Sequence, residues 1–251
     1  MTFLSVIIPA YNEEDRLPVT IKRVSEFLHE KEYKSEIIIV ENGSTDATTE
    51  VAEMWLTIFT AFQKNVRGRV IHSEKGKGAA VRKGMLMGQG TWLYMADADL
   101  SSPVETIDMM TPPEFVGDVA IGSRSLPGAS HVVKGTPMLR KISGGIFNML
   151  TRLLLPGVSD TQCGFKMFRR EVAKQVFSAS VVDGWAFDVE ILYLARLFGY
   201  EIEEKLVYWK YDADSRVNLW GDSVEMAADL FRIWVRGRSG EYETQSNPAR
   251  I

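Results

Sequence analysis

Short apolar segments alternate with segments of helical periodicity through the first half of this chain, and this alternation restricts the fold more than any other feature. The apolar segments are rich in Val and Ile and predict strands at 4–9, 36–41, 69–73, 91–96 and 119–122. The segments between them predict helices at 17–30, 45–62, 77–89 and 103–110. Strands that alternate with helices indicate an α/β fold, with a mainly parallel sheet and helices on both faces.

The second half of the chain carries weaker signals. Helical patterns occur at 135–155, 185–199 and 222–236, and a further strand is expected at 205–210. The chain has 251 residues, of which 45% are hydrophobic, so it can form one large core. We therefore expect a single domain over residues 1–236, followed by a flexible tail at 237–251.

Polar residues follow each of the first four predicted strands, at the point where the strand ends. These clusters are Tyr11-Asn12-Glu13-Glu14, Glu41-Asn42-Gly43-Ser44, Glu74-Lys75-Gly76-Lys77-Gly78 and Asp97-Ala98-Asp99. The carboxyl ends of parallel strands meet at one edge of a sheet, and ligands bind there in α/β folds. The four clusters should therefore converge on one site.

Asp97 and Asp99 lie two residues apart, so on an extended backbone their side chains share a face. Paired carboxylates of this kind suit Mg²⁺, which takes one or two carboxylates and completes its shell with water and substrate phosphates. Alternatively, Asp99 caps the helix that begins near Pro103 and Asp97 forms a turn. The position at the end of a strand favours the metal.

The clusters after the second and third predicted strands contain glycine, and each also allows two interpretations. Gly76 and Gly78 permit close backbone approach, and the helix that begins near Lys77 would offer free N–H groups to an anion, with Lys75 adding charge. The alternative is a solvated basic turn. Glu41 and Asn42 precede the other turn, where a base or a ribose could be bound.

A local basic field interrupts a chain whose net charge is −4. Residues 119–159 contain no Asp or Glu, but they contain Arg124, Lys134, Arg140, Lys141 and Arg152. Apolar residues at helical spacing accompany these charges, and the segment 230–238 repeats the pattern. Such helices can lie in an anionic membrane interface, or they can simply face a core. The negative net charge argues against a nucleic-acid partner.

No signal peptide and no apolar stretch of 18 residues is evident in the sequence. Cys163 is the only cysteine, which excludes an intrachain disulfide and fits a reducing compartment. We expect a cytoplasmic protein that associates peripherally with the cytoplasmic face of a membrane.

Six motifs, taken in order, carry a resemblance to a known family. They are SVIIPAYNEE at 5–14, IIIVENGSTD at 37–46, GKGAAVRKG at 76–84, ADADL at 96–100, SDTQCGFKMF at 159–168 and GWAFDVEIL at 184–192. Together they resemble the family 2 inverting glycosyltransferases of the GT-A fold, and most closely the branch that acts on dolichyl and polyprenyl phosphates. The resemblance covers about residues 4–236.

The resemblance implies a nucleotide-sugar donor, with UDP-glucose the first expectation, and a Mg²⁺ or Mn²⁺ ion. Residues 1–122 would form the donor-binding half and residues 123–236 the acceptor-binding half. The implied donor-binding residues are Pro9, Tyr11, Glu13, Glu41, Asn42, Lys75, Lys77, Asp97, Ala98 and Asp99, with Asp97 and Asp99 at the metal. Many relatives have two acids after the second strand, whereas this chain has Glu41-Asn42.

The acceptor side is expected to bind a polyprenyl phosphate through Arg124, Arg140 and Arg216. A phosphate arrives already anionic and needs no general base. Gln162 and Trp185 would lie near the sugar. If the acceptor were instead a soluble hydroxyl compound, Asp188 would be the catalytic base. A non-catalytic nucleotide-sugar-binding module and a nucleotidyltransferase are further alternatives.

Overall fold

The computed structural model describes residues 1–127, 131–132, 147, 149–210 and 221–246. Seven strands form one sheet in the order β3-β2-β1-β4-β7-β5-β8. Their bounds are β1 Leu4–Ala10, β2 Ser35–Glu41, β3 Val66–His72, β4 Trp92–Met95, β5 Val119–Ser123, β7 Lys166–Arg169 and β8 Ile202–Leu206. A separate parallel pair joins β6 (His131–Val132) to β9 (Trp209–Lys210).

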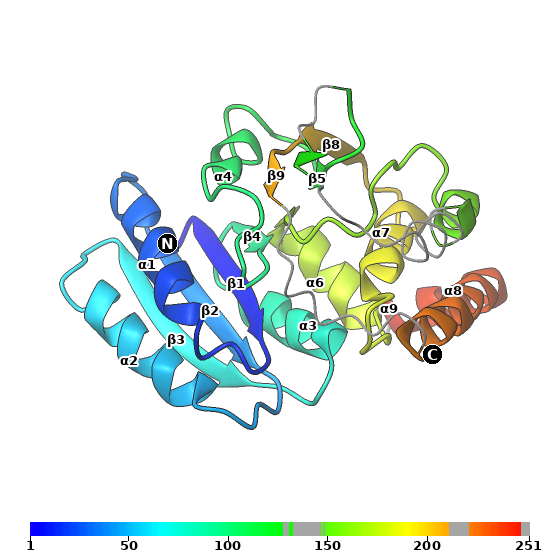
Figure 1. Ribbon diagram of the computed structural model, residues 1–251. Coiled ribbons are helices and arrows are strands. Elements are labelled where there is room, and N and C mark those ends of the chain that lie inside the picture. The colour runs from blue at the N-terminus through cyan, green and yellow to red at the C-terminus, as the bar shows by residue number, and fades with distance from the viewer. Residues whose placement is uncertain (128–130, 133–146, 148, 211–220, 247–251) are drawn as a thin grey trace.

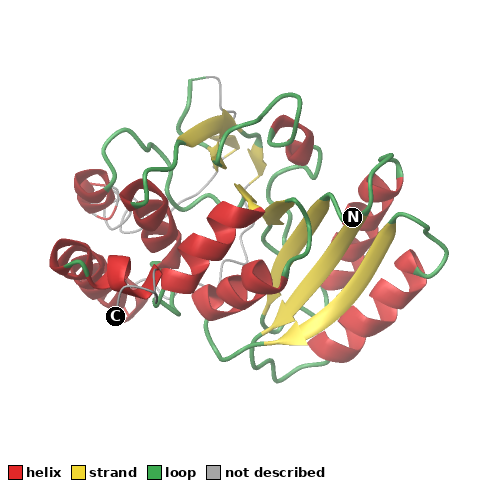
Figure 2. Cartoon of the chain, turned by 180° about the vertical axis from the view of Figure 1, so that it is seen from behind, coloured by secondary structure: helices red, strands yellow, loops and turns green. Residues whose placement is uncertain are grey.

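Helices cover both faces of this sheet (Figures 1 and 2). On one face lie α1 (Leu17–His29), α2 (Thr48–Thr60) and α4 (Thr106–Met109). On the other lie α3 (Lys77–Met87), α6 (Arg170–Ala179), α7 (Phe187–Leu197), α8 (Gly221–Ser239) and α9 (Glu241–Ser246). The α/β architecture expected from the alternating pattern is confirmed.

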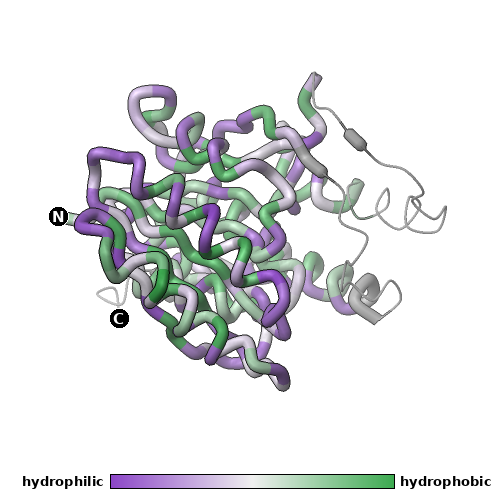
Figure 3. The backbone as a smooth tube through the Cα atoms, turned by 60° about the vertical axis from the view of Figure 1, so that its left-hand side comes forward, coloured by the Kyte–Doolittle hydropathy of each residue, from purple (hydrophilic) through white to green (hydrophobic). Residues whose placement is uncertain are grey.

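The central strands are buried on both faces, as a covered parallel sheet requires. In β1, Ile7 packs into the core on the α3 side, while its neighbours Val6 and Ile8 pack into the core on the α1 side. This alternation explains why β1 and β2 are apolar along most of their length. Figure 3 shows hydrophobic segments in green running through the middle of the molecule.

One strand departs from the parallel pattern. β7 runs antiparallel to both of its neighbours, β4 and β5, so the sheet is mixed. The sequence reading assigned no strand at Lys166–Arg169 and no helix at Arg170–Ala179. The strand is short and contains a buried lysine, Lys166, so it lacks the apolar signature on which the prediction relied.

The predicted tail is wrong for residues 237–246. Helix α8 continues to Ser239, and α9 follows it after Gly240, whose φ of 74° allows the turn between them. Tyr242 of α9 is only 1% exposed. A single buried aromatic ring anchors this polar segment, and composition alone does not reveal such an anchor.

Two other expectations change at their boundaries. The strand expected at 205–210 is divided between the end of β8 at Leu206 and β9 at Trp209–Lys210. Most of the helix expected at 135–155 lies outside the described residues, although residues 149–154 are helical. Among the helices that the structure describes, none is both long and apolar enough to cross a membrane.

Candidate active site

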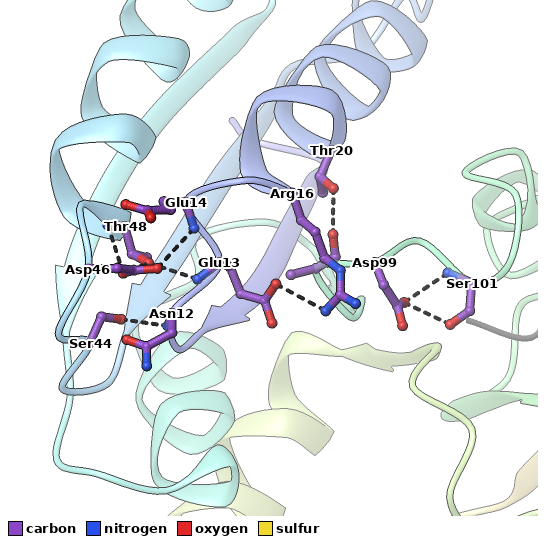
Figure 4. A network of polar contacts seen from close by, with 11 residues as sticks. Asn12, Glu13, Glu14, Arg16, Thr20, Ser44, Asp46, Thr48, Asp99 and Ser101 are labelled. Atoms are coloured by element: carbon purple, nitrogen blue, oxygen red, sulfur yellow. Dashed lines mark hydrogen bonds and ion pairs between the residues drawn. The ribbon is translucent and has the colours of Figure 1, made fainter. Parts of the chain in front are cut away.

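The loops after β1, β2, β3 and β4 meet at one edge of the sheet, as predicted. Asn12 N–H donates to Ser44 Oγ at 3.0 Å (Figure 4). Thr45 N–H donates to Asn12 Oδ1 at 2.7 Å. On the other side of this edge, Lys77 Nζ lies 2.7 Å from Asp97 Oδ1. The convergence follows from the parallel arrangement of these four strands.

The loop after β1 is fixed by the start of α2. Asn12 has a φ of 53°, a left-handed conformation that Asn tolerates better than most residues. Glu13 N–H donates to Thr48 Oγ1 at 2.8 Å, and the Glu13 carboxylate lies 3.3 Å from Arg16 (Figure 4). Tyr11 lies at this edge with Lys75 Nζ 5.6 Å from its ring centroid, whereas Pro9 is buried inside β1.

Glu41 and Asn42 are both buried at the end of β2, but their side chains differ in what they contact. Glu41 accepts hydrogen bonds from Ser44 N–H and pairs with His72 Nδ1 at 3.0 Å. Although burial opposes the change, these hydrogen bonds lower the pKa of Glu41. Asn42 is 5% exposed, and its Oδ1 has no hydrogen-bond partner among the described residues. Asn42 is therefore the member of this pair whose side-chain oxygen still lacks a partner among the described residues.

Lys77 and Asp97 form a charged pair at the centre of the edge. Burial works against the charge on Lys77, but Asp97 and Asp188 together raise its pKa. Burial likewise opposes the charge on Asp97, and Lys77 lowers the pKa of that carboxyl group. The aromatic ring centroid of Trp185 lies 5.4 Å from Lys77 Nζ and that of Phe187 lies 6.0 Å away. The pair therefore stays ionised at neutral pH beside two aromatic rings.

Gly164 is a site residue that sequence reasoning missed, although it lies in the quoted motif SDTQCGFKMF. A Cβ at position 164 would come within 2.0 Å of Asp97 Oδ2. Only glycine leaves room for Asp97 to turn towards Lys77 at this point. The available signal was the glycine itself, within that motif.

Asp99 is the exposed carboxylate of the Asp97-Ala98-Asp99 cluster. Its Oδ1 accepts hydrogen bonds from Ser101 N–H at 2.9 Å and from Ser101 Oγ at 2.7 Å (Figure 4). These bonds form the turn that was the alternative interpretation of Asp99. No hydrogen bond within the described part of the chain engages Oδ2, so this oxygen can still bind a cation. Ala98, between the two aspartates, is buried and holds the turn through its carbonyl, which accepts from Thr20 Oγ1.

The oxygen ligands at this edge fit a single divalent ion that also binds a diphosphate. The described residues contain no group of three or more His, Cys, Asp or Glu side chains placed to hold a metal. One exposed carboxylate, Asp99, with Asp97 behind it, is nevertheless what Mg²⁺ and Mn²⁺ sites in phosphate-binding enzymes provide, since the phosphates supply other ligands. Because Asp97 is already paired with Lys77, Asp99 is the better candidate for direct coordination.

Two N–H groups in the first turn of α3, those of Gly78 and Ala79, face a carbonyl oxygen of the protein, so these two are not free for an anion as expected. Gly78 N–H donates to the carbonyl oxygen of Asp183 at 2.8 Å, and Ala79 N–H approaches the same oxygen at 3.4 Å. The glycines serve this contact. A Cβ at Gly76 would lie 2.4 Å from Asp183 O, and a Cβ at Gly78 would lie 2.3 Å from Val182 O. The two glycines do permit a close approach, as expected, but what approaches them is the backbone of Val182 and Asp183 and not a ligand.

This contact predicts a large effect of one methyl group on stability. Gly78→Ala should lower the free energy of unfolding by about 1–3 kcal/mol, the range for overpacking a filled site. Urea denaturation would measure it. Gly184→Ala, next to Asp183, is the control, because its Cβ would meet no atom closer than 3.9 Å. Equal stabilities for the two variants would contradict the close approach.

Asp188 does not stand free in the cleft. It is 4% exposed, and its Oδ1 is ion-paired with Nζ of Lys166, which is fully buried on β7 and also donates to the carbonyl of Cys163. Burial raises the pKa of Asp188, and Lys166 and Lys77 oppose this rise. Lys166 was not among the predicted site residues, since nothing in its sequence neighbourhood identifies its partner 22 positions away.

The predicted acceptor residues are placed unevenly. Arg124 makes three hydrogen bonds with the buried Asp160: backbone N–H to Oδ2 at 2.9 Å, Nε to Oδ2 at 2.7 Å and Nη2 to Oδ1 at 2.8 Å. Burial opposes charge on Asp160, but Arg124 lowers its pKa. Gln162 and Trp185 are half-buried. Arg140 and Arg216 lie outside the described residues.

Comparison with protein families gives a match over most of the chain. The profile described as glycosyl transferase family 2 matches residues 5–177. Dolichyl-phosphate beta-glucosyltransferase of Dictyostelium discoideum is 36% identical, with 97% of this chain and 77% of the relative covered. The enzymes of that name from Drosophila melanogaster and Homo sapiens are 35% and 31% identical, with 97% and 96% of this chain and 78% of each relative covered.

Solved structures share the fold at low sequence identity. Glucosyl-3-phosphoglycerate synthase from Mycobacterium tuberculosis in complex with UDP has a TM-score of 0.67 and 17% identity, over 92% of this chain and 80% of that chain. The same enzyme with Mn²⁺ and UDP-glucose has a TM-score of 0.65 and 17% identity, over 92% and 79%. At this identity the likeness establishes a common architecture.

Proposed function

Because this chain belongs to glycosyl transferase family 2 and is a glycosyltransferase, we propose that it transfers glucose from UDP-glucose to a polyprenyl phosphate such as dolichyl phosphate. The relatives that bear the name dolichyl-phosphate beta-glucosyltransferase match nearly the whole chain. The fold expected for the family, GT-A, is the fold observed.

The donor would lie along the edge formed by the loops after β1 to β4. Asn42, with its unpartnered Oδ1, would contact the uracil, with Tyr11 and Glu13 nearby. The crystal complexes of the similar mycobacterial enzyme contain UDP and UDP-glucose, which supports a uridine donor. Glu41 would act indirectly, because its carboxylate holds Ser44 and His72 and so shapes the loop beside Asn42.

Charge stabilisation would come from Asp99, Lys77 and Lys75. A divalent ion held by Asp99 would neutralise negative charge on the leaving diphosphate. Lys77, kept protonated by Asp97, would lie near the same phosphates, and the exposed Lys75 would add positive charge at the rim. As the C1–O bond to UDP breaks, its electron pair stays with UDP, and preorganised positive charge favours that step.

The observation that carries the acceptor proposal is the ion pair between Asp188 and Lys166. A hydroxyl acceptor needs a base to remove its proton, and the best candidate base is already neutralised by a buried lysine. A phosphate monoester is ionised near neutral pH, so one of its oxygens can attack C1 directly and no proton has to be removed. Attack from the face opposite UDP would invert C1.

Access to a lipid would come from exposed apolar side chains on α8 and on the helical residues 149–154. These two helical segments lie at one end of the molecule (Figures 1 and 2). Helix α8 exposes Phe231, Trp234 and Val235, and the helical residues 149–154 expose Met149 and Leu153. Arginines accompany them at positions 152, 232 and 238, and the Arg238 guanidinium lies 5.4 Å from the Trp234 ring centroid. Aromatic and basic residues on one helix suit the interface of an anionic membrane.

One assay tests the donor, the metal and the acceptor together. The protein is incubated with UDP-glucose, UDP-GlcNAc or GDP-mannose, with Mn²⁺ or EDTA, and with a short polyprenyl phosphate in vesicles that contain phosphatidylserine. Mass spectrometry should detect a glucosyl polyprenyl phosphate and UDP with UDP-glucose and Mn²⁺, and no product with EDTA. Sedimentation of the same vesicles should carry the protein down.

Other products would identify the competing functions. Transfer to 3-phosphoglycerate or a sugar hydroxyl, with none to the polyprenyl phosphate, would replace the lipid acceptor by a soluble one. Release of pyrophosphate would indicate nucleotidyl transfer. UDP-glucose binding without any turnover across the acceptor panel would favour a binding module.

A further inference from the structure

The loop at 180–186 forms one wall of the donor edge. Its Asp183 carbonyl accepts from Gly78 and Ala79 in the first turn of α3, and its Asp183 side chain pairs with Arg82 of the same helix. Arg82 Nη1 also donates to Ser180 O at 3.3 Å. Trp185, from the same loop, lies beside the Lys77 ammonium group. The position of this loop therefore determines the surroundings of Lys77.

A buried carboxylate holds the loop from behind. Glu190 of α7 is fully buried and accepts from Val181 N–H at 3.0 Å and from Val182 N–H at 2.9 Å through Oε2. Its Oε1 accepts from the hydroxyl of Tyr242 at 2.8 Å. Burial raises the pKa of Glu190, while these hydrogen bonds oppose the rise. The carboxylate of Glu190 therefore connects Tyr242 of α9 to the backbone of the 180–186 loop.

Close packing does not supply this support on the outer side of the loop. A cavity of about 330 Å³ separates the loop from α8 and α9 there. Its lining includes Val181, Val182 and Asp183 of the loop, Arg232 of α8 and Tyr242 of α9. Because a cavity borders the loop there, the hydrogen bonds from Val181 and Val182 to Glu190 are what hold the loop in place.

We propose that Tyr242 and Glu190 are positioning residues for the donor site, which hold the 180–186 loop so that Lys77 is presented to the donor diphosphate. The inference rests on the proposed role of Lys77 in donor binding. If Tyr242 has this role, α9, at the end of the described chain, contributes to a site whose other residues follow the first four strands. Tyr242 acts through Glu190, the loop backbone and α3, and touches no substrate.

Tyr242→Phe tests the proposal with the loss of one hydroxyl group. The Kd for UDP with Mn²⁺, measured by calorimetry, should rise about three- to ten-fold, since a hydrogen bond to a charged group is lost at the far end of the chain of contacts. The KM for UDP-glucose should rise equally, and kcat should stay within about two-fold because the bound donor can still be attacked. Tyr193→Phe is the matched control. Its ring lies 6.5 Å from that of Tyr242, and none of the described residues hydrogen-bonds its hydroxyl.

A double-mutant cycle separates this inference from the proposed function. Lys77→Met should weaken UDP binding, and adding Tyr242→Phe to it should produce little further loss, because both changes act on the same contact. If Lys77→Met binds UDP as the unmutated protein does, the proposed role of Lys77 fails and the inference fails with it. If Lys77→Met weakens binding but Tyr242→Phe does not, or if the two effects simply add, only the inference is overturned.

Hydrogen exchange gives a test that needs no variant. Coupling between two sites is reciprocal, so UDP with Mn²⁺ should slow amide exchange at Val181 and Val182 in the unmutated protein. The amides at Lys34 and Ser35, at the opposite end of the strands, serve as the internal reference. Unchanged exchange at 181–182 under saturating UDP would overturn the proposal even if Tyr242→Phe failed to fold.

Discussion

Asp99→Ala is expected to lower kcat for glucose transfer by about 10²- to 10³-fold, the loss typical of removing one preorganised group that stabilises transition-state charge. Asp99 carries the only exposed carboxylate of the Asp97-Ala98-Asp99 cluster, with Oδ2 open to a cation. Initial rates with UDP-glucose and polyprenyl phosphate, measured across a Mn²⁺ titration, would give both kcat and the metal requirement. Half-saturation by Mn²⁺ should move to higher concentration.

The controls separate charge from local structure. Asp99→Asn retains an oxygen that can accept from Ser101 N–H and so keeps the turn, but it removes the negative charge. If the metal role is correct, the asparagine variant should be nearly as slow as the alanine variant. Asp15→Ala removes an exposed aspartate from another loop and should be neutral. Full activity of Asp99→Asn would show that the turn matters and the charge does not.

Asp188→Asn should cost about 3–5 kcal/mol of folding free energy, because it leaves the Lys166 ammonium group buried without its counter-ion. For a chain of this length, that corresponds to a fall in Tm of roughly 6–20 °C. Differential scanning calorimetry would measure the fall. The remaining folded protein should still transfer glucose to a phosphate acceptor, since that acceptor needs no base.

A compensating variant tests whether the loss comes from the unpaired charge. Lys166→Met combined with Asp188→Leu replaces both charges by apolar side chains and should recover most of the stability. A double variant as unstable as Asp188→Asn would point to a cause other than the ion pair. Abolished transfer by well-folded Asp188→Asn, with UDP binding intact, would instead identify Asp188 as a base and a hydroxyl acceptor.

The donor edge could be predicted from the sequence because each part of it is encoded locally. The apolar runs that became β1, β2, β3 and β4 end where polar residues begin, and a parallel sheet brings all such ends together. That rule predicts that the loops of Lys77 and Asp97 meet, and the structure adds their ion pair. The existence of these four strands was therefore predictable, while their ends shifted, as in β3, which begins at Val66.

The features that were missed all depend on partners distant in sequence. Gly76 and Gly78 appear suited to a phosphate until the backbone of residues 182–183 is seen against them. Lys166 and Asp188 each appear available until they are seen together. Tyr242 belongs to a polar segment that gives no sign of its buried contact with Glu190. Local pattern identifies which groups are present, but tertiary packing decides which of them remain available to a ligand.

The antiparallel strand β7 has a consequence for how such proteins can be recombined. It comes from the second half of the chain, yet it lies between β4 and β5 of the first half, with Met95 opposite Lys166 and Ala120 opposite Met167. A chimaera joined after residue 122 would import a foreign strand into the middle of the sheet, together with the lysine that neutralises Asp188. New acceptor specificities should therefore arise by substitution within this scaffold more readily than by exchange of whole halves.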